Sequence, residues 1–178
     1  MPHAIVIAEY DPRWAVLFDK LHVVLDDALG NLAVHIHHVG STAVPGLDAK
    51  PILDIDIEVA ARNKIPAAVE RLTPLGYVHV GDGGIPTRER FDRIDKQVPW
   101  TSPRYLRYAH HLYACASDSP ELARHLAFRD HLRSQPEDAA AYSKLKLQLA
   151  EQFGEDRDGY AEAKTEFITD ILSRAASV

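Results

Sequence analysis

The sequence is poor in cysteine and in long apolar runs. Its single cysteine, Cys115, excludes an intrachain disulfide and is typical of the reducing cytoplasm, where we expect this protein. No stretch approaches the roughly 20 apolar residues needed to cross a bilayer, so no membrane role is expected. Residues 1–5 lack the basic and long apolar regions of a signal peptide, which agrees with a cytoplasmic location.

Positive charge is also scarce. The chain has 20 Lys and Arg against 26 Asp and Glu, a net charge of −6. This balance argues against nucleic acid and anionic membranes as partners. No HExxH motif or paired Cys/His spacing is present, so no structural or proteolytic zinc site is expected. The length of 178 residues suits one domain, residues 1–178, and no pattern specifies an oligomeric state.

Apolar periodicity and turn residues predict an α+β (α/β) architecture. Strands are expected at residues 5–8, 34–39, 52–59, 77–80, 88–94 and 108–116. Helices are expected at residues 12–29, 65–75, 120–133, 136–153 and 159–175. The order predicts a mixed β-sheet flanked by helices over about residues 1–118, and a helical C-terminal third over about residues 119–178.

A Gly-Ser turn, Gly40-Ser41, ends one predicted strand. Glycine lets a backbone approach phosphate closely, and the N–H groups and hydroxyls of Ser41 and Thr42 can donate to its oxygens. An ordinary strand-ending turn explains Gly-Ser alone better, but the Asp-x-Asp that follows favours phosphate. Lys50 fits a solvated loop cation and a phosphate ligand equally well.

Two aspartates, Asp54 and Asp56, interrupt the most strongly β-forming run of the chain. Residues i and i+2 of a strand share one face about 6.6 Å apart, so both carboxylates project together. Two adjacent carboxylates repel each other unless a cation or proton offsets them. Mg²⁺ (or Mn²⁺) is the expected cation, since it prefers oxygen ligands and leaves positions open for phosphate. The alternative is a half-exposed strand with its acids turned to solvent.

Cations on the predicted C-terminal helices are further candidates. Arg129 shares an apolar helix face, so it needs a carboxylate or phosphate partner. A structural pair with Asp11 or Asp130 and a role in substrate binding are equally consistent with this position. Two Tyr-x-x-x-Lys pairs, Tyr142–Lys146 and Tyr160–Lys164, place each lysine on one face with its tyrosine and could supply cations for a polyphosphate.

Two other features point to a site. Among the ten histidines, His38 and one of the adjacent pair His110 and His111 are the candidates for site residues. The segment 88–107 carries a local net charge of about +3, which would draw an anionic substrate. Its basic residues are Arg88, Arg90, Arg93, Lys96, Arg104 and Arg107.

Taken together, these motifs resemble the GrpB family of small bacterial proteins, which is placed in the polymerase-beta-like nucleotidyltransferase superfamily. The resemblance extends over nearly the whole chain. It is carried by Tyr10 to Trp14, His38 to Ile55, His110 to Tyr113, Phe128 to Arg133, Tyr142 with Lys146, and Tyr160 with Lys164.

The resemblance implies a nucleotidyltransferase-like sheet and a Mg²⁺-dependent nucleotidyltransferase that moves a nucleotidyl group from a nucleoside triphosphate to a small acceptor. The superfamily pattern is a Gly-Ser turn, a spacer, Asp-x-Asp and a third carboxylate on a neighbouring strand. Here the strand expected to carry that third acid holds His110 and His111 instead.

On this reading, Asp54 and Asp56 hold the metal and His110 orients or deprotonates the acceptor. The expected nucleotide-binding residues are Gly40, Ser41, Thr42, Lys50, Arg129, Lys146 and Lys164. The missing third acid favours a second hypothesis, a non-catalytic nucleotide- or coenzyme-A-binding module with a degenerate site. A third is an interaction domain with a vestigial site.

Overall fold

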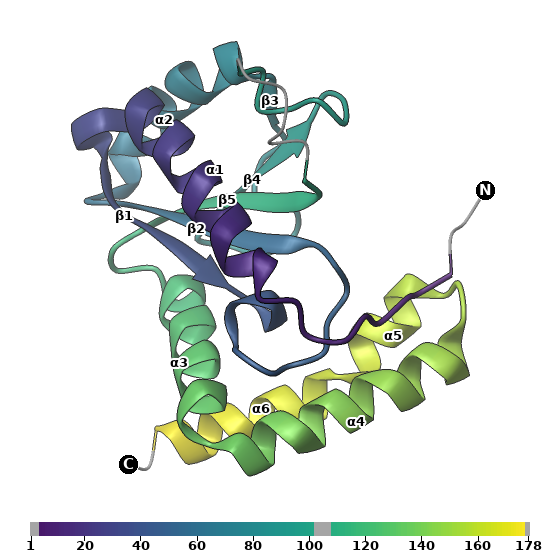
Figure 1. Ribbon diagram of the computed structural model, residues 1–178. Coiled ribbons are helices and arrows are strands. Elements are labelled where there is room, and N and C mark those ends of the chain that lie inside the picture. The colour runs from purple at the N-terminus through teal and green to yellow at the C-terminus, as the bar shows by residue number, and fades with distance from the viewer. Residues whose placement is uncertain (1–3, 102–107, 177–178) are drawn as a thin grey trace.

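A computed structural model describes residues 4–101 and 108–176 of the chain, and its described strands form one mixed sheet (Figure 1). The strand order is β1-β2-β5-β4-β3, with β2 and β5 parallel and the other neighbours antiparallel. The strands are β1 (Ala33–Val39), β2 (Leu53–Val59), β3 (Tyr77–His79), β4 (Arg88–Arg93) and β5 (His110–Ala116).

Six α-helices accompany the sheet in the described residues. They are α1 (Arg13–Leu29), α2 (Ile65–Leu72), α3 (Pro120–Ser134), α4 (Pro136–Phe153), α5 (Arg157–Ala163) and α6 (Thr165–Ala175). None of the helices in the described part of the chain is long and apolar enough to span a membrane.

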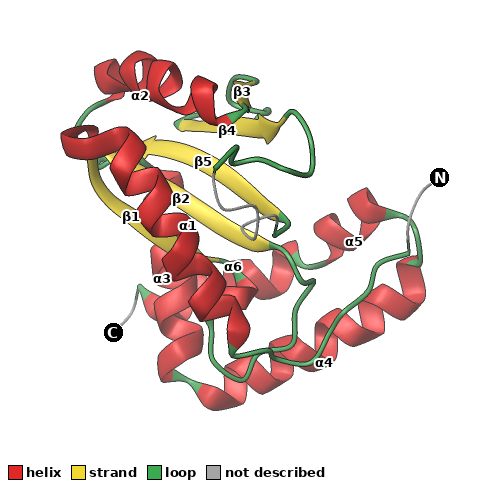
Figure 2. Cartoon of the chain, turned by 45° about the horizontal axis from the view of Figure 1, so that its top comes forward, coloured by secondary structure: helices red, strands yellow, loops and turns green. Residues whose placement is uncertain are grey.

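Helices α1 and α2 cover one face of the sheet, and Figure 2 shows α1 lying across β1 and β2. The apolar stripe of α1, which includes Leu21 and Leu25, packs on alternate residues of β2, which include Ile55 and Ile57. All four of these side chains are fully buried. Because side chains alternate along a strand, packing of this set against α1 turns the intervening acids of β2 to the other face.

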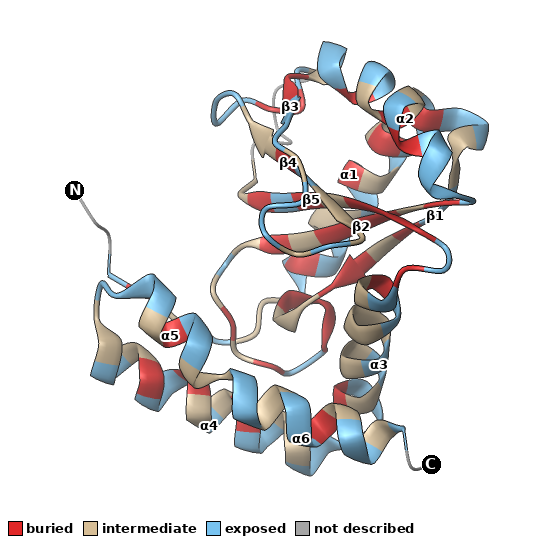
Figure 3. Ribbon diagram, turned by 180° about the vertical axis from the view of Figure 1, so that it is seen from behind, coloured by how far each residue is buried: buried red, intermediate tan, exposed pale blue. Residues whose placement is uncertain are grey.

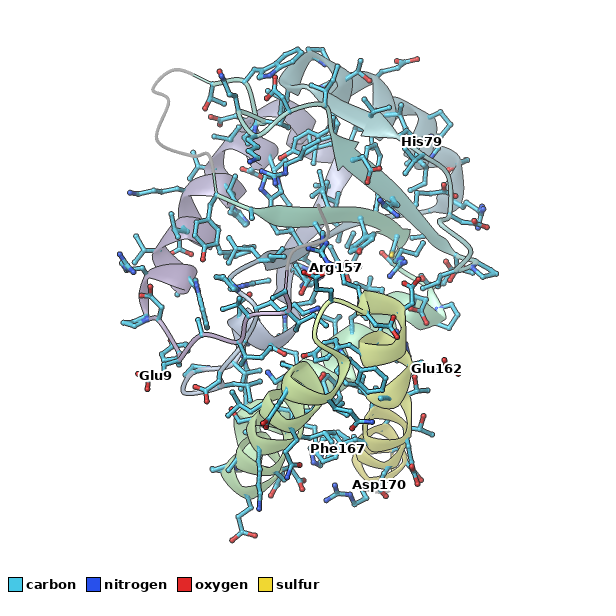
Figure 4. All side chains as sticks on the ribbon, turned by 90° about the vertical axis from the view of Figure 1, so that its right-hand side faces the viewer. Glu9, His79, Arg157, Glu162, Phe167 and Asp170 are labelled. Carbon is cyan, nitrogen blue, oxygen red and sulfur yellow. The ribbon has the colours of Figure 1, made fainter. Side chains whose placement is uncertain are left out.

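The other face of the sheet meets the C-terminal helices. Figure 3 shows α3, α4, α5 and α6 below the sheet, with α1 behind the strands. A second apolar cluster joins the loop after β1 to these helices through Val44, Leu47, Leu132 and Tyr142. The ring of Phe167 stacks on Tyr142 with the ring centroids 5.2 Å apart, and Figure 4 shows Phe167 between the helices.

The observed elements confirm the α+β class with its mixed sheet, and they correct two details. Residues 5–8 form no strand, because only Ala8 bridges to Ala49 while Ile5 donates its N–H to the carbonyl of Gly154. The helix expected at 159–175 is two helices that meet at Lys164. The N–H of Lys164 bonds to the carbonyl of Ala161, three residues back, which tightens the chain at that point.

Candidate functional site

The two aspartates of β2 face the C-terminal helices, as the alternation of the strand predicts. The side chain of Asp54 is 34% exposed, whereas that of Asp56 is fully buried. Asp54 therefore presents an accessible carboxylate to the space between the sheet and these helices. The carboxylate of Asp56 is buried behind it.

Strand β5 runs beside β2 and contributes His111 and Tyr113 to the same face. In the parallel register Asp54 pairs with His111, and Asp56 pairs with Tyr113. The His111 imidazole donates from Nδ1 to Oδ1 of Asp54 at 2.9 Å. A histidine and a tyrosine thus occupy the positions of β5 that flank the two acids.

His110 lies on the opposite face of β5, which corrects the sequence-based role of acceptor base. Its Nδ1 donates to the carbonyl of Tyr108 at 2.8 Å, so its Nε2 accepts from the hydroxyl of Tyr77, also at 2.8 Å. Burial lowers the pKa of His110 to about 4, which keeps the ring neutral. Of the two adjacent histidines, His111 is the one that reaches Asp54.

The Gly40-Ser41 turn lies directly against the acids. Gly40 has φ 68° and ψ −172°, a conformation that is essentially restricted to glycine. A Cβ at this position would lie 2.3 Å from Oδ2 of Asp54. Ser41 opens the short 3₁₀ turn after Gly40, and its side chain faces the cavity. The Gly-Ser turn and the Asp-x-Asp motif, which are separated in the sequence, therefore lie next to each other in the structure.

Thr42 and His38 stabilise this turn from behind. Nε2 of His38 and the hydroxyl of Thr42 are 2.9 Å apart, and both side chains are buried. The His38 ring also stacks on Phe18, with centroids 4.7 Å apart. Burial lowers the pKa of His38 to about 4. The Thr42 hydroxyl, expected to bind phosphate, is thus engaged with His38.

Three lysines that are distant in sequence converge beside Ser41 and Asp54. The ammonium groups of Lys50 and Lys164 lie over the Tyr160 ring, 4.1 Å and 4.4 Å from its centroid. Lys146 lies 4.7 Å from the centroid of Tyr142 and donates to the carbonyl of Asp48. Within the described residues, none of the three ammonium groups forms an ion pair with a carboxylate.

Burial and mutual repulsion make these lysines easier to deprotonate. Burial and the charge of Lys164 lower the pKa of Lys146 to about 7. Burial and the charge of Lys50 lower the pKa of Lys164 to about 8, against an opposing effect of Asp54. Burial, followed by the charge of Arg157, also lowers the pKa of Lys50. Figure 4 shows Arg157 where the C-terminal helices face the sheet. An anion bound here would relieve this repulsion.

Arg129 forms a structural contact, one of the two alternatives that its position allowed. Its Nε donates to Asp130 at 2.7 Å, and its Nη1 donates to the carbonyl of His38 at 3.1 Å. Arg129 therefore joins α3 to the end of β1, and it does not line the cavity beside Asp54.

The space beside Asp54 has two adjoining parts, which we call the lysine chamber and the arginine chamber. The lysine chamber has a volume of about 220 Å³, and its walls include Ser41, Lys50, Asp54, Lys146, Tyr160 and Lys164. The arginine chamber has a volume of about 250 Å³, and its walls include Arg88, Tyr113, Arg124, His125, Phe128 and Tyr142. Ser41, Asp54 and Lys164 line both chambers.

The structure adds His125 of α3, which the sequence analysis missed. Its Nδ1 donates to Oδ2 of the buried Asp56 at 2.7 Å, and its Nε2 lies 3.7 Å from Oε2 of Glu121. The spacing of four residues from Glu121 to His125 and from His125 to Arg129 is the helical signal that could have indicated a shared face. Arg104 and Arg107 of the basic segment lie outside the described residues.

One feature of the two acids is compatible with a divalent cation. Oδ1 of Asp56 is buried and has no hydrogen-bond partner among the described residues. A cation held by Asp56 would satisfy this atom. No group of three His, Cys, Asp or Glu side chains able to hold a metal occurs in the described part of the chain. Mg²⁺ is nevertheless commonly bound through one or two carboxylates together with substrate phosphates, so two acids suffice for it.

Comparison with known sequences connects this geometry to one family. The profile described as GrpB protein matches residues 4–174. The protein BH1888 of Halalkalibacterium halodurans is 34% identical over 98% of this chain and 85% of its own length. The protein YqkA of Bacillus subtilis is also 34% identical over 89% of this chain. The chain spans 43% of the length of YqkA.

Comparison with solved structures supports the same assignment. The crystal structure of GrpB from Enterococcus faecalis has a TM-score of 0.80 and 31% identity, covering 97% of this chain and 98% of that one. The Cid1 poly(U) polymerase with bound MgGTP has a TM-score of 0.55 and 12% identity, covering 82% of this chain and 44% of Cid1. At this identity the second likeness shows a shared fold alone.

Proposed function

The chain belongs to the GrpB family, and for this member we propose a Mg²⁺-dependent nucleotidyltransferase activity that moves a nucleotidyl group from a nucleoside triphosphate to a small acceptor. One observation carries this proposal. Three lysine ammonium groups without carboxylate partners adjoin an accessible aspartate and a Gly-Ser turn within one cavity of the described residues.

The lysine chamber supplies what a triphosphate requires. A triphosphate carries three to four negative charges, and Lys50, Lys146 and Lys164 offset them at a site that excludes much of the water. The Ser41 side chain lines both chambers and donates to a phosphate oxygen. Binding also removes the repulsion among the lysines, so affinity and proton uptake are coupled.

The acids and His111 act on the reacting groups. Asp54 and Asp56 would hold the metal, which when bound neutralises charge on the triphosphate. An acceptor oxygen forms the new bond to the α-phosphorus, the bond to the β-phosphate oxygen breaks, and pyrophosphate leaves. His111 lines the lysine chamber and donates from Nδ1 to Asp54, so its Nε2 is left to accept the proton of a hydroxyl that attacks the α-phosphorus in that chamber.

Calorimetric titration with a non-hydrolysable nucleoside triphosphate and Mg²⁺ tests the binding step. We expect affinity to fall in the order triphosphate, diphosphate, monophosphate, and to fall about tenfold or more in Lys164→Met. Lys144→Met is the matched control, because Lys144 is an exposed lysine on α4 that lines neither chamber. Equal affinity of wild type and Lys164→Met would contradict the assignment of the triphosphate to the lysine chamber.

Incubation with α-labelled nucleoside triphosphates, Mg²⁺ and a bacterial metabolite extract tests the transfer step. Label should move from the triphosphate to a new product, and this should stop in Asp54→Asn and Asp56→Asn. Mg²⁺ should also raise the melting temperature of the nucleotide-bound wild type and not that of Asp54→Asn, a measurement that requires no acceptor.

A second candidate function is nucleotide binding without transfer. The observation that favours it is the pair His111 and Tyr113 at the β5 positions beside the acids, where a third carboxylate would stand. This function predicts the same order of phosphate affinities with no labelled product from any extract. The labelling experiment therefore separates the candidates.

A further inference from the structure

The arginine chamber is chemically different from the lysine chamber beside it. Its walls combine aromatic rings, from Tyr113, Phe128 and Tyr142, with one guanidinium that stands over a ring. The charged centre of Arg88 lies 4.1 Å from the centroid of Tyr113. The chamber therefore offers flat apolar surfaces and a planar cation.

Arg88 is the arginine of this chamber that lacks a counter-ion. Within the described residues it has no carboxylate within ion-pair distance, and its Nε is buried without a hydrogen-bond partner. Glu121 acts on Arg88 only at longer range, because both its oxygens accept hydrogen bonds from Arg124, at 2.9 Å and 3.0 Å. A guanidinium in a partly buried cavity with no anion of its own is a receptor for one.

The other arginine and the histidine of the chamber are already engaged. Arg124 is neutralised by Glu121, and His125 donates to Asp56. The next arginine of the same strand, Arg90, is paired with Asp92 at 2.7 Å. Arg88 is thus distinguished from Arg124 by its free charge, and from Arg90 by its free charge and its place in the cavity wall.

The two chambers share three of the residues expected to serve the reaction. Ser41, Asp54 and Lys164 line both, so a molecule in the arginine chamber would lie next to a triphosphate in the lysine chamber. A transfer reaction needs this arrangement, with donor and acceptor on either side of the metal-binding acid.

We propose that the arginine chamber is the acceptor subsite, and that it takes a small planar or apolar molecule whose carboxylate or phosphate group is bound by the Arg88 guanidinium. This inference rests on the function proposed above and names the chemical class of the acceptor. The anionic group anchors the acceptor on Arg88, and the aromatic walls enclose its body.

Binding of simple probes tests this inference on the full chain. Benzoate and phenyl phosphate carry the two candidate anions on one aromatic body, and benzamide is their uncharged counterpart. We expect at least one anion to bind the protein saturated with Mg²⁺ and a non-hydrolysable nucleoside triphosphate, and to bind about tenfold or more tightly than benzamide. The relative affinities of the two anions distinguish a carboxylate acceptor from a phosphate acceptor.

Substitution of Arg88 identifies the residue responsible. Arg88→Gln should lower the affinity for the anion about tenfold or more and leave nucleotide affinity within about twofold. Arg90→Gln is the matched control and should leave both affinities within about twofold, because Asp92 already neutralises Arg90. Should Arg88→Gln fail to fold, the comparison of each anion with benzamide on wild-type protein decides the question.

The inference is overturned if neither anion binds, if benzamide binds as well as the anions, or if a folded Arg88→Gln binds them unchanged. The same titrations without nucleotide separate this result from the proposed function. Arg88-dependent anion binding in a protein that binds no nucleotide would support the anion subsite while refuting nucleotidyl transfer.

Discussion

Gly40 and the carboxylate of Asp54 are packed so closely that a methyl group at position 40 would lie 2.3 Å from Oδ2 of Asp54. The turn and the acid therefore fix one another in space. Neither can move without disturbing the other, and this coupling sets the position of the only carboxylate that lines both chambers in the described residues.

Gly40→Ala should consequently cost more stability than an ordinary glycine substitution. Gly46 is the matched control, since it also has a positive φ, 80°, but has no atom within 4 Å of a Cβ position. Gly46→Ala should lower the free energy of unfolding by about 1–2 kcal/mol, from backbone strain alone. Gly40→Ala should cost about 1–3 kcal/mol more, because it must also displace Asp54. Urea denaturation measures both free energies of unfolding. Equal losses in the two variants would show that Asp54 moves aside at no cost.

Substitutions of the two adjacent histidines of β5 should affect different properties, stability for His110 and ligand binding for His111. His110→Ala leaves the buried hydroxyl of Tyr77 without its partner and opens a cavity, so the free energy of unfolding should fall by about 2–4 kcal/mol. His111 is 55% exposed, so His111→Ala should change stability by less than about 0.5 kcal/mol. Only His111→Ala should alter binding of Mg²⁺ and nucleoside triphosphate, measured by calorimetry. If nucleotide binding changed only in a folded His110 variant, the predicted role of His110 in orienting or deprotonating the acceptor would be restored.

Loss of His125 should expose the cost of burying Asp56. In His125→Ala both carboxylate oxygens of a fully buried side chain lack partners, so the free energy of unfolding should fall by about 2–4 kcal/mol. His35→Ala, at an exposed histidine of β1, is the control and should cost less than about 0.5 kcal/mol. Added Mg²⁺ should recover part of the loss in His125→Ala, since a cation replaces the missing donor. Urea titrations with and without Mg²⁺ provide the comparison, and no difference between the two histidine variants would refute the role of His125.

The depressed pKa of Lys146 predicts a pH dependence with a definite sign. In the folded protein this amine loses its proton near pH 7, whereas in the unfolded chain it keeps it to about pH 10.4. Between these values the unfolded state binds more protons, so the stability that Lys146 contributes rises with pH in this window and is lost as pH falls through about 7. Lys146→Met should flatten the rise of unfolding free energy from about pH 7 to about pH 10, and Lys144→Met should not. Triphosphate affinity should fall over the lower part of the same window, as Lys146 and then Lys164 lose their charges.

Much of the local structure of this protein could be predicted from short-range patterns in the sequence. Alternation of Leu53, Ile55 and Ile57 with Asp54 and Asp56 determined a strand with an apolar face and an acidic face, because side chains alternate on any strand. The Tyr-x-x-x-Lys spacing determined that each lysine of α4 and of the α5–α6 junction lies beside a tyrosine ring. These relationships span two to four residues and need no knowledge of the fold.

What only the tertiary structure decided is which side chains meet across the sheet and helices. His110 and His111 are equivalent in the sequence, and the register of β5 against β2 alone turned one into the core and the other to Asp54. His125 and Arg88 come from a helix and a strand far from the acids in sequence, so their contacts depend on long-range packing that local periodicity does not encode. The free charge of Arg88 and the crowding of three lysines are likewise properties of neighbours in space, because electrostatic energy depends on distance and burial rather than on position along the chain.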